Sequence, residues 1–177
     1  MGGQSTRFGR DKASFAVAGR PMALHVAAAL SACLETVTLV GECRAHFNTG
    51  LPAIPDSMPN AGPLGGIVAA LGHARRSWSV IAACDMPLAS SAQVASLLHA
   101  AAVCEAQAVI PRTPDGRLQP LFAAYHRSAR SPLASALAEG RLKLARALDA
   151  VRWTELAVTD GTGFTNVNTR ADVPLLP

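Results

Sequence analysis

The sequence predicts an α/β fold, a three-layer α/β/α sandwich around a mostly parallel sheet. Two observations carry this prediction. Strand-like runs alternate along the chain with helical segments of ten or more residues, which is the pattern of βαβ units. The run at 78–84 (WSVIAAC) is also continuously apolar, as in a strand that is buried in a parallel sheet. At 177 residues, with no repeat or linker, we expect a single domain spanning 1–177.

The first half of the chain alternates helix and strand. Residues 21–34 (PMALHVAAALSACL) open on Pro and carry apolar residues at helical spacing, which predicts a helix. Residues 36–40 (TVTLV) predict a short strand that a glycine ends. After a turn-rich stretch, residues 64–74 predict a helix entered through glycines, and residues 78–84 a strand that ends at Asp85.

The second half continues the alternation and adds a hairpin. Residues 91–103 predict a helix and residues 106–111 (AQAVIP) a strand. A Pro-Asp-Gly turn at 114–116 joins that strand to a second one at 118–125. The chain then continues with helices at 132–138 and 142–150, separated by Gly140, and a strand near 153–158.

Composition excludes several classes of protein. No stretch approaches the ~18 uninterrupted apolar residues of a membrane helix, and the N-terminus lacks the apolar region of a signal peptide, so we expect a cytoplasmic protein without a membrane partner. The net charge of +4 comes from scattered basic residues without a run. The charge could suggest nucleic acid, but a small anionic substrate explains it equally well, and because no basic run appears we expect no nucleic-acid partner.

The cysteines indicate neither a zinc site nor a disulfide framework. They are widely spaced, with no C-x-x-C pair. We expect them to be small buried apolar residues. They are Cys33, Cys43, Cys84 and Cys104.

The opening GGQSTRFGRDK is the first candidate site. Gly2 and Gly3 let the backbone approach an anion without a Cβ in the way, and Arg7 and Lys12 add positive charge. Only two of the sixteen basic residues are Lys, so Lys12 suggests a need for a compact, flexible ammonium. The loop matches neither a Walker loop nor a dinucleotide fingerprint.

Two carboxylates at the ends of strands, where α/β sheets bind ligands, and one amide near the C-terminus are further candidates. Asp85, in CDMP, stands where Mg²⁺ and a triphosphate can be held, since Mg²⁺ usually takes only one or two protein carboxylates. Asp56 lies in a turn-rich loop whose backbone donors suit a ribose, base or phosphate. Asn168, in FTNVNT, can cap a helix or bind a metal.

Five motifs together resemble the molybdenum cofactor guanylyltransferases, the MobA-like branch of the nucleotidyltransferases. They stand in the order and spacing of that family and cover nearly the whole chain. They are GGQSTRFGRDKA, PDSMPNAGPLGGI, CDMPL, RLQPLFAAYHR and FTNVNTRADV.

The resemblance implies a Rossmann-like nucleotidyltransferase sheet and a GTP-dependent reaction. The terminal phosphate of molybdopterin, or of its molybdenum-loaded form, attacks the α-phosphorus of GTP and expels pyrophosphate. By the motif matches, Gly2, Gly3 and Lys12 would hold the GTP phosphates and Asp56 would contact the nucleotide. On physical grounds Arg7 would help Lys12 to screen the developing negative charge. Asp85 binds Mg²⁺, and Asn168 assists the metal or the pterin phosphate. Cofactor-inserting enzymes or molybdoenzyme chaperones are the expected protein partners.

Two alternatives to this function stay open. One is a molybdopterin cytidylyltransferase that uses CTP, although its first loop typically has Ala-Gly where this chain has Gly2-Gly3. The other is a non-catalytic nucleotide or pterin carrier. Turnover with GTP against CTP, and pyrophosphate release, separate them.

The resemblance also implies that a first strand is missing. In the resembling proteins an apolar strand runs directly into the glycine pair, and here Met1 occupies its last position. We therefore expect the natural chain to begin roughly six to ten residues earlier, the length of one strand.

Overall fold

The computed structural model describes four stretches of the chain, residues 15–41, 49–56, 61–169 and 171–172. Gly2, Gly3, Arg7 and Lys12 lie outside these described residues. Their expected roles therefore stay predictions.

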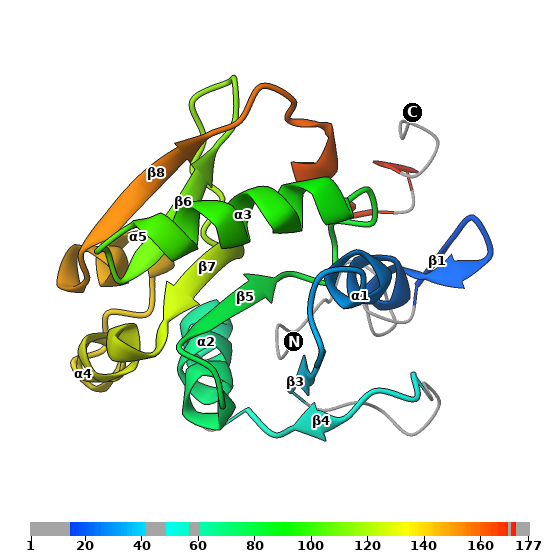
Figure 1. Cartoon of the computed structure of the whole chain (residues 1–177). Coiled ribbons are helices and arrows are strands. Elements are labelled where there is room, and N and C mark those ends of the chain that lie inside the picture. Colours follow the sequence, from blue (N-terminus) through cyan, green and yellow to red (C-terminus); the bar gives the residue numbers. More distant parts are fainter. Residues whose placement is uncertain (1–14, 42–48, 57–60, 170, 173–177) are drawn as a thin grey trace.

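The largest sheet among the described residues has four strands (Figure 1). Its order is β5 (Trp78–Ala82), β7 (Phe122–His126), β6 (Ala108–Arg112) and β8 (Trp153–Ala157). β7 is antiparallel to β5 and to β6, whereas β6 and β8 are parallel. Three strands thus share one direction, and β7 is reversed because a hairpin turn, with Gly116 at φ +83°, returns the chain after β6.

Two shorter sheets accompany it. β3 (Leu39–Val40) pairs in parallel with β4 (Ala53–Ile54). β1 (Ala16–Val17) and β2 (Arg20–Pro21) form an antiparallel hairpin that the sequence pattern did not predict.

The helices lie where the apolar spacing predicts them, with ends shifted by a few residues. None of the described helices is long and apolar enough to cross a membrane. The helices are α1 (Met22–Ser31), α2 (Gly62–His73), α3 (Ser91–Val103), α4 (Arg130–Ala138) and α5 (Leu144–Ala147), and the short 3₁₀ turns are η2 (Arg127–Ala129), η3 (Leu148–Ala150) and η4 (Thr162–Phe164).

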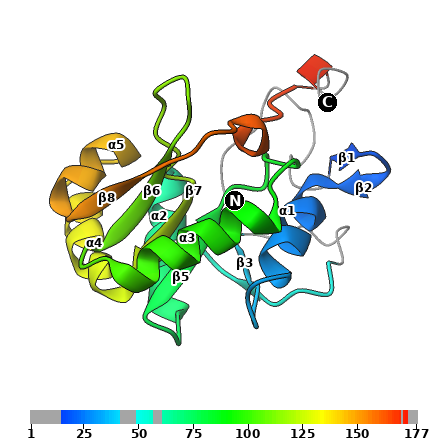
Figure 2. The ribbon, with the colours of Figure 1, turned by 45° about the horizontal axis from the view of Figure 1, so that its top comes forward.

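Helices cover both faces of the sheet, as expected for a sandwich. Alternate side chains of a strand point to opposite faces, and on β6 Ile110 packs in the cluster that contains α2 and α4 residues. Its neighbour Val109 packs in the cluster that contains residues of α1 and α3. Figure 1 shows α3 lying across the sheet, and Figure 2 shows the end of α3 beside α1.

Burial differs sharply between the strands. Residues 108–111 of β6 and 122–125 of β7 are fully buried, whereas every residue of β5 is only half-buried. The expectation of a buried parallel strand at 78–84 is therefore corrected. β5 pairs antiparallel with β7 and, within the described part of the chain, has no strand on its other edge.

The cysteines also differ from expectation. Cys33, Cys84 and Cys104 are half-buried rather than fully buried, and Cys43 lies outside the described residues. Cys33 and Cys104 follow the last turns of α1 and α3, where their thiols face backbone carbonyls. Helix ends are less covered by neighbours than helix centres, which accounts for the partial exposure.

Candidate functional site

Three loops meet one edge of the central sheet. β5, β6 and β8 run in the same direction, so the loops that follow them leave from the same side, which we call the carboxyl edge. In open α/β sheets this edge is where ligands bind. Its loops span residues 83–90, 113–121 and 158–169.

Asp85 is placed by the end of β5. The Ala83 N–H donates to the Leu121 carbonyl at 2.7 Å, which extends the pairing with the β7 side by one residue. The chain then turns, and the buried side chain of Met86 anchors the turn in the core beneath α3. Asp85 therefore stands half-buried in a turn that is fixed on both sides.

The C-terminal segment is bonded directly to this turn. The Val167 N–H donates to the backbone carbonyl of Asp85 at 2.8 Å. The Val167 side chain is fully buried with Val17 and Met22, so an apolar cluster holds the segment from the other side. The structure thus brings together CDMP and FTNVNT, two motifs that the sequence analysis singled out.

Asn168 follows Val167 directly and begins a tight turn. The carboxylate of Asp172 accepts hydrogen bonds from the N–H groups of Asn168 and Thr169 at 2.7 and 2.8 Å, and from the Thr169 hydroxyl at 2.9 Å. Asn168 itself is exposed. Its amide side chain is therefore on the surface, in a turn that Asp172 fixes.

Asp56 belongs to the second sheet. It lies two residues after β4, is half-buried, and precedes α2. The helix begins at Gly62, whose φ of +62° suits glycine because it has no Cβ. Asp56 thus follows a strand end, as predicted, although the part of its loop at 57–60 is outside the described residues.

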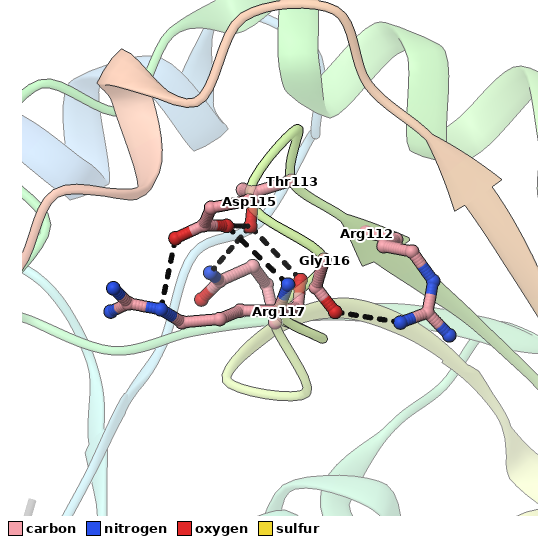
Figure 3. Close-up of polar contacts among 6 residues, drawn as sticks. Arg112, Thr113, Asp115, Gly116 and Arg117 are labelled. Carbon is pink, nitrogen blue, oxygen red and sulfur yellow. Dashed lines mark hydrogen bonds and ion pairs between the residues drawn. The ribbon is translucent and has the colours of Figure 1, made fainter.

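The loop between β6 and β7 adds a polar network that the sequence analysis missed (Figure 3). The hydroxyl of Thr113, a residue that is only 6% exposed, donates to the Asp115 carboxylate at 2.6 Å. This bond is the main cause that lowers the pKa of Asp115. Asp115 also pairs with the Arg117 guanidinium at 2.9 Å, and Arg112 donates to the Gly116 carbonyl at 2.6 Å.

This network fixes an arginine at the carboxyl edge. The side chain of Arg117 is 80% exposed, yet Asp115 orients it. A fixed guanidinium is a good partner for phosphate or carboxylate. The PDGR turn was the available sequence signal, but it indicated only a hairpin.

A hollow of about 330 Å³ lies beside the C-terminal segment. Ser90, the N-cap of α3, and Gln93 and Ser96 of α3 form its polar wall, and Phe164 forms part of its apolar wall. The volume lies at the lower end of the range for small-molecule pockets. It opens next to the segment that binds the Asp85 turn.

The part of the chain that the structure describes contains no cluster of metal ligands. Within the described residues, no three His, Cys, Asp or Glu side chains lie close enough to hold a metal ion. Asp85 offers one carboxylate at the carboxyl edge, and Mg²⁺ usually takes only one or two protein carboxylates and fills its shell with substrate phosphates and water.

Comparisons with known proteins agree with this geometry. The family described as "MobA-like NTP transferase domain" matches residues 1–154. The molybdenum cofactor guanylyltransferase of Cupriavidus metallidurans is 34% identical over 176 residues, covering 95% of this chain and 87% of the relative. The probable molybdenum cofactor guanylyltransferase of Deinococcus radiodurans is 35% identical over 174 residues, covering 97% and 88%.

Solved structures show the same fold. The molybdopterin-guanine dinucleotide biosynthesis protein A of Archaeoglobus fulgidus superposes with a TM-score of 0.82 at 24% identity, covering 99% of this chain and 93% of that one. The 2-C-methyl-D-erythritol 4-phosphate cytidylyltransferase of Thermus thermophilus gives 0.69 at 19% identity, covering 93% and 91%.

Proposed function

This chain belongs to the MobA-like NTP transferase family and is a nucleotidyltransferase; from that premise we propose that it transfers GMP from GTP to molybdopterin or its molybdenum-loaded form. The relatives that carry the name molybdenum cofactor guanylyltransferase support this substrate pair. The structural observation that carries the proposal is the Asp85 turn at the carboxyl edge, with the C-terminal segment bonded to its backbone.

The proposed reaction exchanges one phosphorus–oxygen bond for another. An oxygen of the terminal phosphate of molybdopterin bonds to the α-phosphorus of GTP. The bond from that phosphorus to the oxygen bridging to the β-phosphorus breaks, and its electron pair leaves with pyrophosphate. The product is the guanine dinucleotide form of the cofactor.

Repulsion between two phosphates is the main obstacle to this reaction. Catalysis is therefore chiefly charge neutralisation and in-line positioning rather than proton transfer. In the proposal, the N–H groups of Gly2 and Gly3 hold the phosphates that leave as pyrophosphate, and Lys12 and Arg7 neutralise the charge that develops. Asp56 contacts the nucleoside part of GTP.

Asp85 would hold Mg²⁺ when the nucleotide brings it, and Asn168 would assist at the metal or at the acceptor phosphate. Bound Mg²⁺ supplies Lewis-acid polarisation of the phosphoryl oxygens. The chain's own contribution is to fix Asp85. Its carbonyl accepts from the Val167 N–H, and the neighbouring Met86 is buried, so the backbone that carries its carboxylate is held in place.

We further propose that the whole chain, 1–177, acts as one domain in the cytoplasm, where GTP is available. We expect it to deliver its product to a cofactor-inserting enzyme or a molybdoenzyme chaperone. Co-purification with such a protein tests the second part.

One assay tests the proposed function directly. The purified protein is incubated with molybdopterin, MgCl₂ and either GTP or CTP, and both pyrophosphate and the pterin dinucleotide are measured. We expect GTP-dependent release of pyrophosphate in step with the guanine dinucleotide. Faster turnover with CTP would make the protein a cytidylyltransferase, and tight binding without pyrophosphate would make it a carrier.

A further inference from the structure

The three loops that form the carboxyl edge, all of which the structure describes, contain a single basic residue, Arg117. They also contain three carboxylates, Asp85, Asp115 and Asp160. The proposed reaction brings the phosphates of two substrates to this edge, and phosphates pair best with charged N–H donors. Arg117 is therefore the one side-chain cation that these loops offer to a substrate.

The loop that carries Arg117 is fixed to both other loops of the edge. A Cβ at Gly161 would lie 3.5 Å from Cδ of Pro114, so the C-terminal segment lies directly on the β6–β7 loop. At its other end, the β6–β7 loop is joined to the turn after β5 by the 2.7 Å hydrogen bond from the Ala83 N–H to the Leu121 carbonyl. Both segments that carry candidate residues are thus neighbours of this loop.

The guanidinium of Arg117 is held at one nitrogen. Its Nε pairs with the Asp115 carboxylate at 2.9 Å, and that carboxylate is itself held by the Thr113 hydroxyl at 2.6 Å. No hydrogen bond to either Nη group is found among the described residues. A guanidinium has five N–H donors, and the side chain is 80% exposed. The donors on the two Nη atoms therefore form a planar fork that faces solvent.

Arg112, the other arginine of this hairpin, is bound quite differently. Its Nε pairs with Glu155 at 2.6 Å, and it donates to the Gly116 carbonyl at 2.6 Å. Figure 3 shows the guanidinium groups of Arg112 and Arg117 pointing in opposite directions. Arg112 therefore holds the hairpin to β8, whereas the terminal donors of Arg117 remain available to a ligand.

The Asp85 turn stands between Arg117 and the expected place of the nucleotide. Asp56, which would contact the nucleoside, follows β4 of the small sheet. Figure 1 shows this sheet on one side of β5, with β7 and β6 on the other. The turn after β5 carries Asp85, and the loop between β6 and β7 carries Arg117. A ligand at Arg117 and a nucleotide at Asp56 can therefore approach Asp85 together, from two sides.

Resting on the proposed function, we propose that the Nη fork of Arg117 binds the terminal phosphate of molybdopterin, and that Asp115 positions this fork. Two parallel N–H donors match two oxygens of a phosphate, so the contact gives direction as well as charge. A fork that is fixed before binding loses little side-chain entropy when the acceptor arrives. Arg117 thereby holds one phosphate near another that repels it, which is the main obstacle to this reaction.

Binding measurements without turnover test this inference. The affinity for molybdopterin is measured from the fluorescence of its pterin, once with the intact compound and once after a phosphatase has removed its phosphate. The affinity for GTP with MgCl₂ is measured separately by calorimetry. The titrations compare the wild type with Arg117→Ala, Arg117→Lys and a matched control, Arg152→Ala. Arg152 is exposed and lies before β8, at the opposite end of the sheet.

We expect Arg117→Ala to bind intact molybdopterin at least about tenfold more weakly, because charge-assisted hydrogen bonds contribute that much. Arg117→Lys should recover only part of the loss, because an ammonium lacks the fork. Removal of the phosphate should weaken binding to the wild type by a similar factor and should not weaken binding to Arg117→Ala further. Arg152→Ala should bind molybdopterin like the wild type, and all of these proteins should bind GTP equally well.

The variant Asp115→Ala tests the positioning role. The guanidinium of Arg117 stays but loses its anchor, so we expect the affinity for intact molybdopterin to fall about threefold, because the side chain must then be ordered on binding. In the Arg117→Ala background the same substitution should have no further effect on this affinity. An equal loss in both backgrounds would mean that Asp115 only stabilises the loop.

Three results would overturn the inference. They are equal affinities of the wild type and Arg117→Ala for intact molybdopterin, a loss in Arg117→Ala that is the same with and without the phosphate, and a loss of affinity for GTP alone. The last would place the guanidinium on the nucleotide. Each leaves the proposed function standing if the wild type still releases pyrophosphate from GTP and molybdopterin. A wild-type protein that binds molybdopterin in neither form would overturn the proposed function and this inference together.

Discussion

The backbone N–H of Val167 donates a 2.8 Å hydrogen bond to the backbone carbonyl of Asp85. This bond joins the turn after β5 to a segment near the C-terminus. Because it uses only backbone atoms, substitution of the Asp85 side chain leaves it in place. The position of Asp85 and the chemistry of its carboxylate can therefore be tested separately.

The variant Val167→Ala tests whether the position of Asp85 matters for activity. Val167 is fully buried with Val17 and Met22, so removing its two methyl-sized groups should lower the free energy of unfolding by about 2 kcal/mol. We also expect kcat to fall more than about tenfold, because the segment moves relative to Asp85. The control is Val109→Ala, at an equally buried position of β6. Equal kcat values for the two variants, at a temperature where both are folded, would contradict a positioning role.

The variant Asp85→Ala tests the chemical role of the Asp85 carboxylate. We expect kcat to fall at least about 1,000-fold, because metal-assisted charge stabilisation contributes several kcal/mol to the transition state. The unfolding midpoint should change little, since the carbonyl bonded to Val167 remains. Asp149→Ala, at an exposed position of η3, is the matched control and should be fully active. Substantial turnover by Asp85→Ala would exclude the metal-binding role.

Substitution of Lys12 tests whether its ammonium group neutralises the charge of the GTP phosphates. Lys12 lies outside the described residues. We expect Lys12→Ala to lose at least about 100-fold in kcat/KM, because one donor to a developing oxyanion contributes that much. Lys143, the other lysine of the chain, is exposed and provides the control Lys143→Ala. Full activity of Lys12→Arg would refute the idea that a compact ammonium is required there.

Long helices and their order could be predicted from the sequence, but the contacts at the site could not. α3 begins and ends at the predicted residues because its apolar spacing is regular over the whole helix. The β1–β2 hairpin was missed because its turn places Ala18 at φ +48°, where Asn, Asp or Gly is the usual signal. The approach of Val167 to Asp85 depends on the packing of two distant segments, and no local pattern encodes it.

For the candidate site residues, too, the sequence could predict some features and not others. Asp85 and Asp56 follow strand ends, as the alternation of apolar runs and turns predicted. The orientation of Arg117 by Asp115, and of the Asn168 turn by Asp172, depends on side-chain hydrogen bonds between residues two to four apart. Such pairs occur in many turns without any function, so the sequence alone did not distinguish them.

We expect position 163 to require glycine, because the side chain of Gln93 leaves no room there for a Cβ. A Cβ at position 163 would overlap the Gln93 side-chain amide. That amide accepts from the Ser90 N–H at 2.9 Å, while the Ser90 hydroxyl accepts from the Gln93 N–H at 3.3 Å, so the pair caps α3. Gly163→Ala should therefore cost about 1 to 2 kcal/mol, by displacing the cap.

A double variant checks this cause by urea unfolding. Gln93→Ala removes both the overlap and half of the cap. If the overlap is the cause, Gly163→Ala should add almost nothing in the Gln93→Ala background. Additive losses would mean that Gly163 is needed for another reason.

Tyr125 should make the fold sensitive to alkali. It is the only tyrosine, its side chain is fully buried, and its hydroxyl donates to the Pro120 carbonyl at 2.9 Å. Burial disfavours the phenolate and raises the pKa of Tyr125 above its usual value. Because the folded pKa exceeds the unfolded one, which is about 10, this stabilisation is fully present below pH ~10 and is lost as the pH rises toward the folded pKa.

Phenolate absorbance at 295 nm should therefore appear together with the loss of helical circular dichroism. Tyr125→Phe should cost about 1 kcal/mol at pH 7 for the lost hydrogen bond, yet its stability should fall less steeply above pH 10. Phenolate formation in a chain that is still folded would contradict the assignment.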